Sequence, residues 1–85
     1  MPAKYLSTEQ SVQKHLRRLP MHIHEKVIKA LDVIKKNPLS GEKLHGELKS
    51  YYKYRVGDYR IVYQFDSKTS TVIVVKVEHR QGVYR

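Results

Sequence analysis

The chain has 85 residues and no cysteine, and its 17 lysines and arginines outnumber eight acidic residues. The formal net charge is therefore +9, with a pI near 9.9. This length predicts a single domain over residues 1–85, whose small core leaves room only for a shallow, open active site. The absence of cysteine excludes disulfides, thiolate catalysis and cysteine-based zinc sites. The charge favours a polyanionic partner, either nucleic acid or an acidic protein, over a scattered solubilising surface.

No segment of the sequence predicts secretion or membrane insertion. Residues 1–8 lack the apolar run of a signal peptide. The longest apolar run, Val72–Val75, is far too short to cross a bilayer. We therefore expect a cytoplasmic protein with no membrane partner.

The first elements along the chain are a short edge strand and an amphipathic helix. Lys4–Leu6 is the candidate strand, and residues 8–19 are the candidate helix because Val12, Leu16 and Leu19 recur at helical spacing. Ser7 and Gln10 fit a capping box that would satisfy free backbone N–H groups at the helix start.

A second helix is expected after Pro20. Its apolar stripe consists of Ile23, Val27, Ala30, Leu31 and Ile34. It should end at Asn37, because a residue that precedes proline avoids helical geometry. The very short turn between the stripes predicts an antiparallel helical hairpin that covers one face of a sheet.

The remainder of the chain reads as a connection, Leu39–Lys49, followed by three strands. Tyr51–Val56 and Tyr59–Phe65 alternate with period two around Gly57-Asp58, which suits a type II′ turn. Thr71–Val77 is a nearly continuous apolar run, typical of a central strand. The predicted fold is α+β, in the order β-α-α-β-β-β, with the helical hairpin on a small, mostly antiparallel sheet.

The register of this hairpin sorts its side chains into two faces. If Gly57-Asp58 is the loop, directly opposite residues share a face. The face suited to the helices carries Tyr52, Tyr54, Val56, Tyr59, Ile61, Tyr63 and Phe65. The other carries Lys53, Arg55, Arg60, Val62 and Gln64.

Arg55 and Arg60 are directly opposite in this register and should repel each other. Acidic side chains such as Glu47, Asp58 or Glu78 would compensate them if the cluster were purely structural. We prefer the alternative that this face binds an anionic ligand, because cations at alternating positions suit phosphate oxygens.

Two tyrosines stand apart from the expected core. Tyr51 lies at the strand start on the cationic face, where it would either stack on a base or simply pack. Tyr84 lies in a polar tail near Arg80 and Arg85, with no evident core role, and is the better candidate for chemistry.

Two segments resemble the RelE/ParE toxin superfamily. They are Leu44–Tyr63, with its Arg-Val-Gly-Asp-Tyr-Arg core, and His79–Arg85, which resembles the ending of the RelE branch. The resemblance implies a toxin of a type II toxin–antitoxin pair that cleaves mRNA in the ribosomal A site. By the same resemblance, the functional positions are Lys53, Arg55, Arg60, Arg80 and Tyr84. Arg55 stands where the family often has a second lysine.

The resemblance implies cleavage by attack of a 2′-OH on the adjacent phosphate. We assign Arg60 and Arg80 to the phosphate charge, and Lys53 and Arg55 to the RNA backbone. Tyr84 is the candidate general base if nearby cations lower its pKa from about 10; His79 is the competitor. With no carboxylate cluster or paired-histidine motif, we expect neither a metal nor a cofactor.

The expected partners are a cognate antitoxin with an acidic toxin-binding segment, the ribosome and mRNA. Two rival functions stay open at this point. One is a ParE-like toxin that acts on DNA gyrase. The other is a basic module that binds RNA or a peptide without catalysis.

Overall fold

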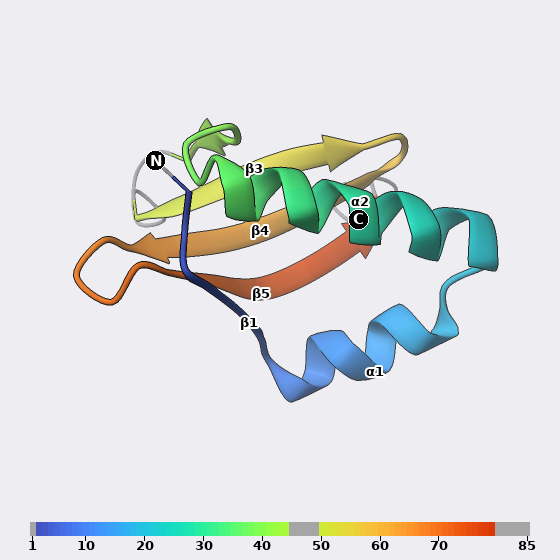
Figure 1. Cartoon of the computed structure of the whole chain (residues 1–85). Helices are drawn as coiled ribbons and strands as arrows, with labels where there is room; N and C mark the ends of the chain where they lie inside the picture. Colours follow the sequence, from blue (N-terminus) through green and yellow to red (C-terminus); the bar gives the residue numbers. More distant parts are fainter. Residues whose placement is uncertain (1, 45–49, 80–85) are drawn as a thin grey trace.

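The computed structural model describes residues 2–44 and 50–79, and these form a sheet with two helices (Figure 1). The elements in chain order are β1 (Tyr5–Thr8), α1 (Gln10–Arg18), α2 (Met21–Lys36), β2 (Glu42–Lys43), β3 (Tyr51–Val56), β4 (Tyr59–Asp66) and β5 (Thr71–His79). The strand order is β1-β5-β4-β3-β2, in which only the β1–β5 pair is parallel. The predicted α+β fold is confirmed. Neither helix within the described ranges is long and apolar enough to cross a membrane.

The start of α1 differs from the predicted capping box. Its N-cap is Glu9, with no side-chain cap hydrogen bond. Ser7 cannot cap the helix because it pairs with Ile73 in the parallel ladder, so β1 runs on to Thr8. The Gln13 side chain instead donates a hydrogen bond of 3.1 Å to the Thr8 carbonyl.

The second helix begins and ends where the prolines predict. Pro20 is the N-cap of α2, and Asn37 follows its last residue. In Figure 1 the chain turns back after α1, so that α2 runs across the sheet in the opposite direction. Both helices bury apolar side chains against the same face of the sheet.

The β3–β4 hairpin has the predicted register, with Val56 opposite Tyr59 and Arg55 opposite Arg60. Gly57 has φ +59°, as the first loop position of a type II′ turn requires. The expectation that residues 39–49 contain no strand is wrong, since β2 pairs with Lys53 and Tyr52 of β3. Two residues are too few to show a periodic pattern.

A β-bulge changes the side-chain alternation within β5. Val74 pairs with Tyr63 and Lys76 pairs with Val62, so Val75 is the extra residue. Before the bulge, Val72 and Val74 are fully buried; after it, Val77 is the buried residue. The bulge therefore moves Lys76 and Glu78 to the open face, away from the helices.

The core is one apolar cluster between the helices and the inner face of the sheet. Its fully buried members are Val27, Ile34, Ile61, Tyr63, Val72 and Val74. Tyr52, Tyr54, Tyr59 and Phe65 pack against it and are partly buried. The face predicted to receive the helices is confirmed.

Tyr63 connects this core to the segment that follows α2. Its hydroxyl donates a 2.8 Å hydrogen bond to the Pro38 carbonyl and accepts one of 3.0 Å from the Gly41 N–H. Its ring stacks on Tyr52 at a centroid distance of 5.4 Å. A Cβ atom at Gly41 would lie 2.6 Å from the hydroxyl and 2.7 Å from the Lys53 carbonyl oxygen, so only glycine fits here.

Replacing Tyr63 by Phe should lower the free energy of unfolding by about 1–3 kcal/mol, because a buried hydrogen bond is lost and the Gly41 N–H loses its partner. Urea denaturation measures the change. Tyr52→Phe is the matched control, since no hydrogen bond of its hydroxyl is found within the described ranges; it should change stability by less than about 0.5 kcal/mol. Equal effects of the two variants would contradict this role of the Tyr63 hydroxyl.

The buried phenol of Tyr63 also makes the free energy of unfolding depend on pH in the alkaline range. Burial raises the pKa of Tyr63 above 10.0, although the Gly41 hydrogen bond partly opposes that shift. The folded state therefore keeps the proton at pH values where the unfolded chain has lost it. The stability linked to this group is complete below pH about 10 and is lost as pH rises through the raised pKa of the folded state.

We therefore expect the stability difference between wild type and Tyr63→Phe to become smaller above pH about 10. Paired urea titrations at neutral and alkaline pH measure it. A difference that stays constant or grows would contradict the raised pKa.

Candidate functional site

The open face of the sheet carries a cluster of charged side chains, which we call the cationic face. Its described members are Glu42 of β2, Lys53 and Arg55 of β3, Arg60 of β4, and Lys76 and Glu78 of β5. Four cations and two carboxylates leave an excess of positive charge. The predicted grouping of Lys53, Arg55 and Arg60 on one face is therefore present in the structure.

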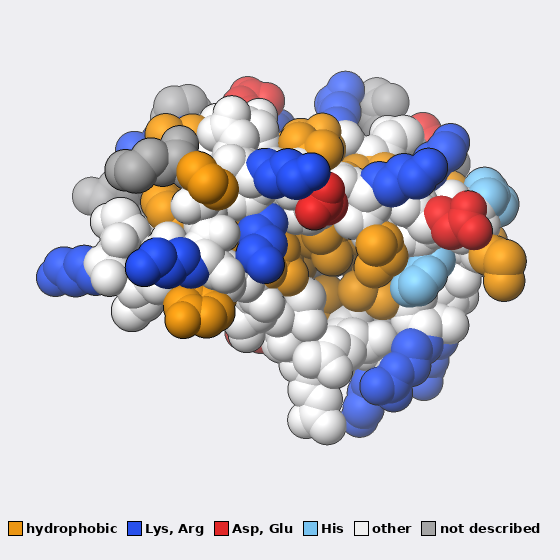
Figure 2. Space-filling model, in the orientation of Figure 1, with side chains coloured by type: hydrophobic (Ala, Val, Ile, Leu, Met, Phe, Trp, Pro, Cys, Tyr) orange, Lys and Arg blue, Asp and Glu red, His pale blue; other side chains and the backbone are white. Residues whose placement is uncertain are grey.

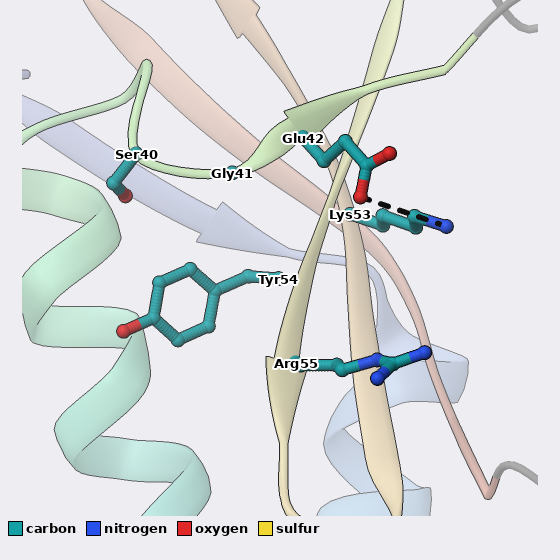
Figure 3. Close-up of a pocket in the computed structure, with 6 residues that line it drawn as sticks. All are labelled: Ser40, Gly41, Glu42, Lys53, Tyr54 and Arg55. Atoms are coloured by element: carbon teal, nitrogen blue, oxygen red, sulfur yellow. Dashed lines mark ion pairs between the residues drawn. The ribbon is translucent and has the colours of Figure 1, made fainter.

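A shallow depression of about 290 Å³ opens at the β2–β3 edge of this face (Figure 3). It is lined by Ser40, Gly41, Glu42, Lys53, Tyr54 and Arg55. Lys53 and Arg55 point to the same side of β3, whereas Tyr54 points towards α2. The Lys53 Nζ lies 3.8 Å from the Glu42 Oε2, a long ion pair in which the Glu42 side chain is 74% exposed and the Lys53 side chain 30% exposed. Such a pair contributes little to stability and leaves the ammonium accessible to another anion.

Arg60 is compensated by an acidic side chain, contrary to the interpretation we preferred from sequence. Its Nε and Nη2 both lie 2.7 Å from Oε1 of Glu78, the residue directly opposite on β5. The bulge at Val75 is the physical reason, because it turns Glu78 to this face. Of the other two candidate acids, Asp58 forms no ion pair within the described ranges, and Glu47 lies outside the described residues.

Arg55 differs from the cations around it. It is exposed, it lies directly opposite Arg60, and no carboxylate within the described ranges lies within 4.0 Å of its guanidinium. Like charges directly opposite on a sheet destabilise it. Arg55 is therefore the cation of this face that is best placed to accept an external anion.

His79 lies on the other face of the sheet. It pairs with Tyr59, one position beyond the Arg60–Glu78 pair, and its ring meets the Tyr59 ring edge-on at 4.8 Å and 87°. Both rings are partly buried. The geometry separates His79 from the cationic face and agrees with its reading as a packing residue at the strand end.

The remaining sequence candidates are placed only in part. Tyr51 is half-buried at the start of β3, opposite Gln64, on the same face as Lys53. Arg80 and Tyr84 lie outside the described residues.

Sequence reasoning missed two members of this face, Glu42 and Lys76, and named Glu78 only as an acid that could compensate the arginines. Glu42 was assigned to a loop, while Lys76 and Glu78 fall on the inner face if β5 alternates without interruption. The charge of Lys76 and Glu78 was the available signal for their face. Residues at positions i and i+2 of a strand point to the same side, and two charged side chains do not belong on the side that contacts the core.

Positive charge is not confined to the cationic face. Figure 2 shows lysine and arginine side chains over the outer surfaces of both helices as well. Those of α2 are Lys26, Lys29, Lys35 and Lys36, all exposed. Overall charge attracts a polyanion from any direction, so the ordered cluster on the sheet must supply the selectivity.

Replacing Arg55 by Gln should increase the free energy of unfolding by a few tenths of a kcal/mol, because it removes the repulsion with Arg60. The gain should shrink as ionic strength rises from about 0.05 M to about 1 M, since salt screens exposed charges. Denaturant melts at both ionic strengths measure it. Lys68→Gln removes a turn lysine as the control and should have no such effect. A destabilised Arg55→Gln variant would show that Arg55 has a stabilising partner.

Comparison with known proteins relates the chain to a family of toxins. A family model described as the ParE toxin of type II toxin–antitoxin systems matches residues 6–84. Toxin RelG of Mycobacterium tuberculosis (strain ATCC 25618 / H37Rv) is 32% identical over 77 residues, which cover 88% of this chain and 88% of RelG.

Two solved structures show the same fold. The toxin–antitoxin complex RelBE2 from Mycobacterium tuberculosis contains a chain with a TM-score of 0.83 and 29% identity, with 94% of each chain covered. A mutant of E. coli toxin RelE in the free state has a TM-score of 0.80 and 26% identity, over 96% of this chain and 88% of RelE. The family match and the RelG match each span most of the sequence, and the resemblance to the RelE/ParE superfamily is confirmed. The chain therefore belongs to the ParE toxin family of type II toxin–antitoxin systems, within the RelE/ParE superfamily.

Proposed function

We propose that this toxin is a ribosome-dependent endoribonuclease that cleaves mRNA in the A site. The observation that carries the proposal is the gathering of Lys53, Arg55 and Arg60 on one open face of the sheet. On this face, the Cβ atoms of residues that are directly or diagonally opposite on paired strands lie within about 5–8 Å of one another. That spacing suits contacts with neighbouring phosphate groups of an RNA strand. The face is shallow and open, so it can receive an extended strand of RNA held by the ribosome.

The reaction needs no group beyond the RNA and the protein. The 2′-oxygen attacks the adjacent phosphorus as its proton passes to a base, and the bond from phosphorus to the 5′-oxygen breaks as that oxygen gains a proton. The products are a 2′,3′-cyclic phosphate and a 5′-hydroxyl. Arg60 and Arg80 would stabilise the charge on the phosphate, where a fixed donor is worth about 10²–10³ in rate.

The remaining roles follow from the chemistry of each side chain. Lys53 and Arg55 would hold the RNA backbone and lower the pKa of a nearby acid or base. Arg55 stays charged throughout, so of these two only Lys53 can exchange a proton. Tyr84 would act as the base, and the packing of His79 against Tyr59 on the other face supports that choice.

The proposed partners follow from the family and from the solved complexes. Toxin–antitoxin complexes such as RelBE2 suggest that a cognate antitoxin holds this toxin inactive. An acidic toxin-binding segment in that antitoxin would suit the excess charge of the cationic face. The ribosome and mRNA would place the protein in the cytoplasm.

One observation favours a second function. The family model that matches the chain is named for ParE, the toxin of the parDE toxin–antitoxin system, and not for RelE. ParE-like activity against DNA gyrase would not require the cationic face. The cluster of Lys53, Arg55 and Arg60 therefore supports the ribonuclease.

Induction of the chain from a repressed promoter in a bacterium tests the proposal. We expect growth arrest and new mRNA 5′ ends within translated codons, both absent in an Arg60→Ala/Tyr84→Phe double variant. Arrest with DNA damage and no such ends would instead identify a gyrase poison. A folded product that causes no arrest would point to a binding module.

Replacing Tyr84 by Phe should lower the single-turnover cleavage rate on programmed ribosomes by about 10²–10⁴, because the base is removed. The melting temperature should stay unchanged. His79→Gln is the matched control and should retain cleavage, because His79 packs on the inner face. Full cleavage by Tyr84→Phe, or loss of cleavage with His79→Gln at unchanged stability, would reverse the two assignments.

A further inference from the structure

We infer that Glu78 is a positioning residue that fixes the guanidinium of Arg60 for contact with the RNA phosphate. The inference rests on the proposed function, since it assigns a role to a residue beside the same site. The cationic face is suited to anions, yet one of its arginines pairs with a carboxylate of the protein itself.

The contact between the two residues is close and well defined. Arg60 Nε and Nη2 both lie 2.7 Å from Glu78 Oε1, and the side chains are only 31% and 24% exposed. The two residues are directly opposite on β4 and β5, so the backbone holds both of them. A carboxylate that receives two donors from one guanidinium restricts the orientation of the guanidinium plane.

The contact leaves much of the guanidinium available. An arginine has five N–H donors, and Glu78 engages only Nε and one hydrogen of Nη2. No other hydrogen bond or ion pair of Arg60 is found within the described ranges. The remaining three donors are thus held in one orientation and can meet a phosphate without first losing side-chain entropy.

The surrounding charges keep Glu78 from repelling RNA. Lys76 Nζ lies 3.8 Å from Glu78 Oε2. Arg55 stands opposite Arg60 on the other side. Two cations thus contact the carboxylate and a third lies one strand beyond Arg60, so the local charge stays positive. Glu78 orients Arg60 without neutralising the site.

The β-bulge at Val75 is what makes this contact possible. Without the extra residue, strict alternation from Val72 and Val74 would direct Glu78 towards the helices. Bulges are often found next to active sites, where they redirect a side chain. The bulge in β5 brings a carboxylate to Arg60 at a position that sequence periodicity assigns to the core.

Single-turnover cleavage on saturating programmed ribosomes tests the role. Glu78→Ala should lower the rate by about 10- to 100-fold, with little change in the half-saturating ribosome concentration, because Arg60 is present but misoriented. Glu78→Gln keeps one acceptor oxygen and should recover most of that loss. Asp32→Ala is the matched control: it also removes a carboxylate paired with a lysine, here Lys36 on α2, and should stay within about twofold.

A double-mutant cycle shows whether Glu78 acts through Arg60. In an Arg60→Ala background, Glu78→Ala should cause no further loss, because its only described arginine partner is gone. The same loss in both backgrounds would overturn the inference. So would faster cleavage or tighter binding by Glu78→Ala, which would show that the carboxylate masks the phosphate site.

A spectroscopic readout does not depend on cleavage. In the free toxin, the Arg60 Nε–H resonance should be protected from exchange and should lose that protection in Glu78→Ala, but not in Asp32→Ala. On addition of a short single-stranded RNA, it should shift in wild type. If wild type cleaves no RNA, the proposed function fails while this measurement still decides the role of Glu78. An unprotected or unchanged resonance would overturn the inference.

Discussion

The buried hydroxyl of Tyr63 is the interaction on which both the fold and the site depend. A phenol in an apolar core needs partners for its polar atom. Tyr63 finds them in the Pro38 carbonyl and the Gly41 N–H, 22 to 25 residues earlier in the chain. That contact holds the segment after α2 against the sheet, where Glu42 and Lys43 pair with β3. The depression beside Lys53 and Arg55 is lined by the same segment, so a hydrogen bond inside the core determines the shape of the cationic face.

The two faces of the sheet have opposite energetic roles. The inner face buries aliphatic and aromatic side chains against α1 and α2 and supplies the stability of a small domain. The outer face includes two arginines directly opposite each other, an arrangement that costs stability. Glu78 offsets the cost for Arg60, whereas Arg55 has no such partner within the described ranges. An arrangement with this cost is typical of a site that receives an anion.

Much of this architecture follows from the sequence, because its signals are local. Pro20 and Pro38 delimit α2, and Gly57-Asp58 fixes the hairpin register together with the grouping of Lys53, Arg55 and Arg60. The features that could not be predicted depend on contacts between distant residues. β2 is defined only by pairing with β3, and the competing role of Ser7 in the parallel ladder removes the expected cap of α1. The bulge in β5 cannot be placed from a run of valines, since a shift by one residue leaves the apolar pattern almost unchanged.

The bulge also determines on which face of the sheet His79, one of the two candidate general bases, lies. Because β5 changes phase at Val75, His79 lies with Tyr59 on the inner side and Glu78 lies with Arg60 on the outer side. In the proposed reaction the RNA would lie on the outer face, and an imidazole packed against a ring on the inner side is poorly placed to take a proton from it. The geometry therefore disfavours His79 as the base of the proposed reaction. Under the proposed function, cations such as those of the outer face would favour an anionic tyrosinate, which is why a tyrosine suits the role of base in that reaction.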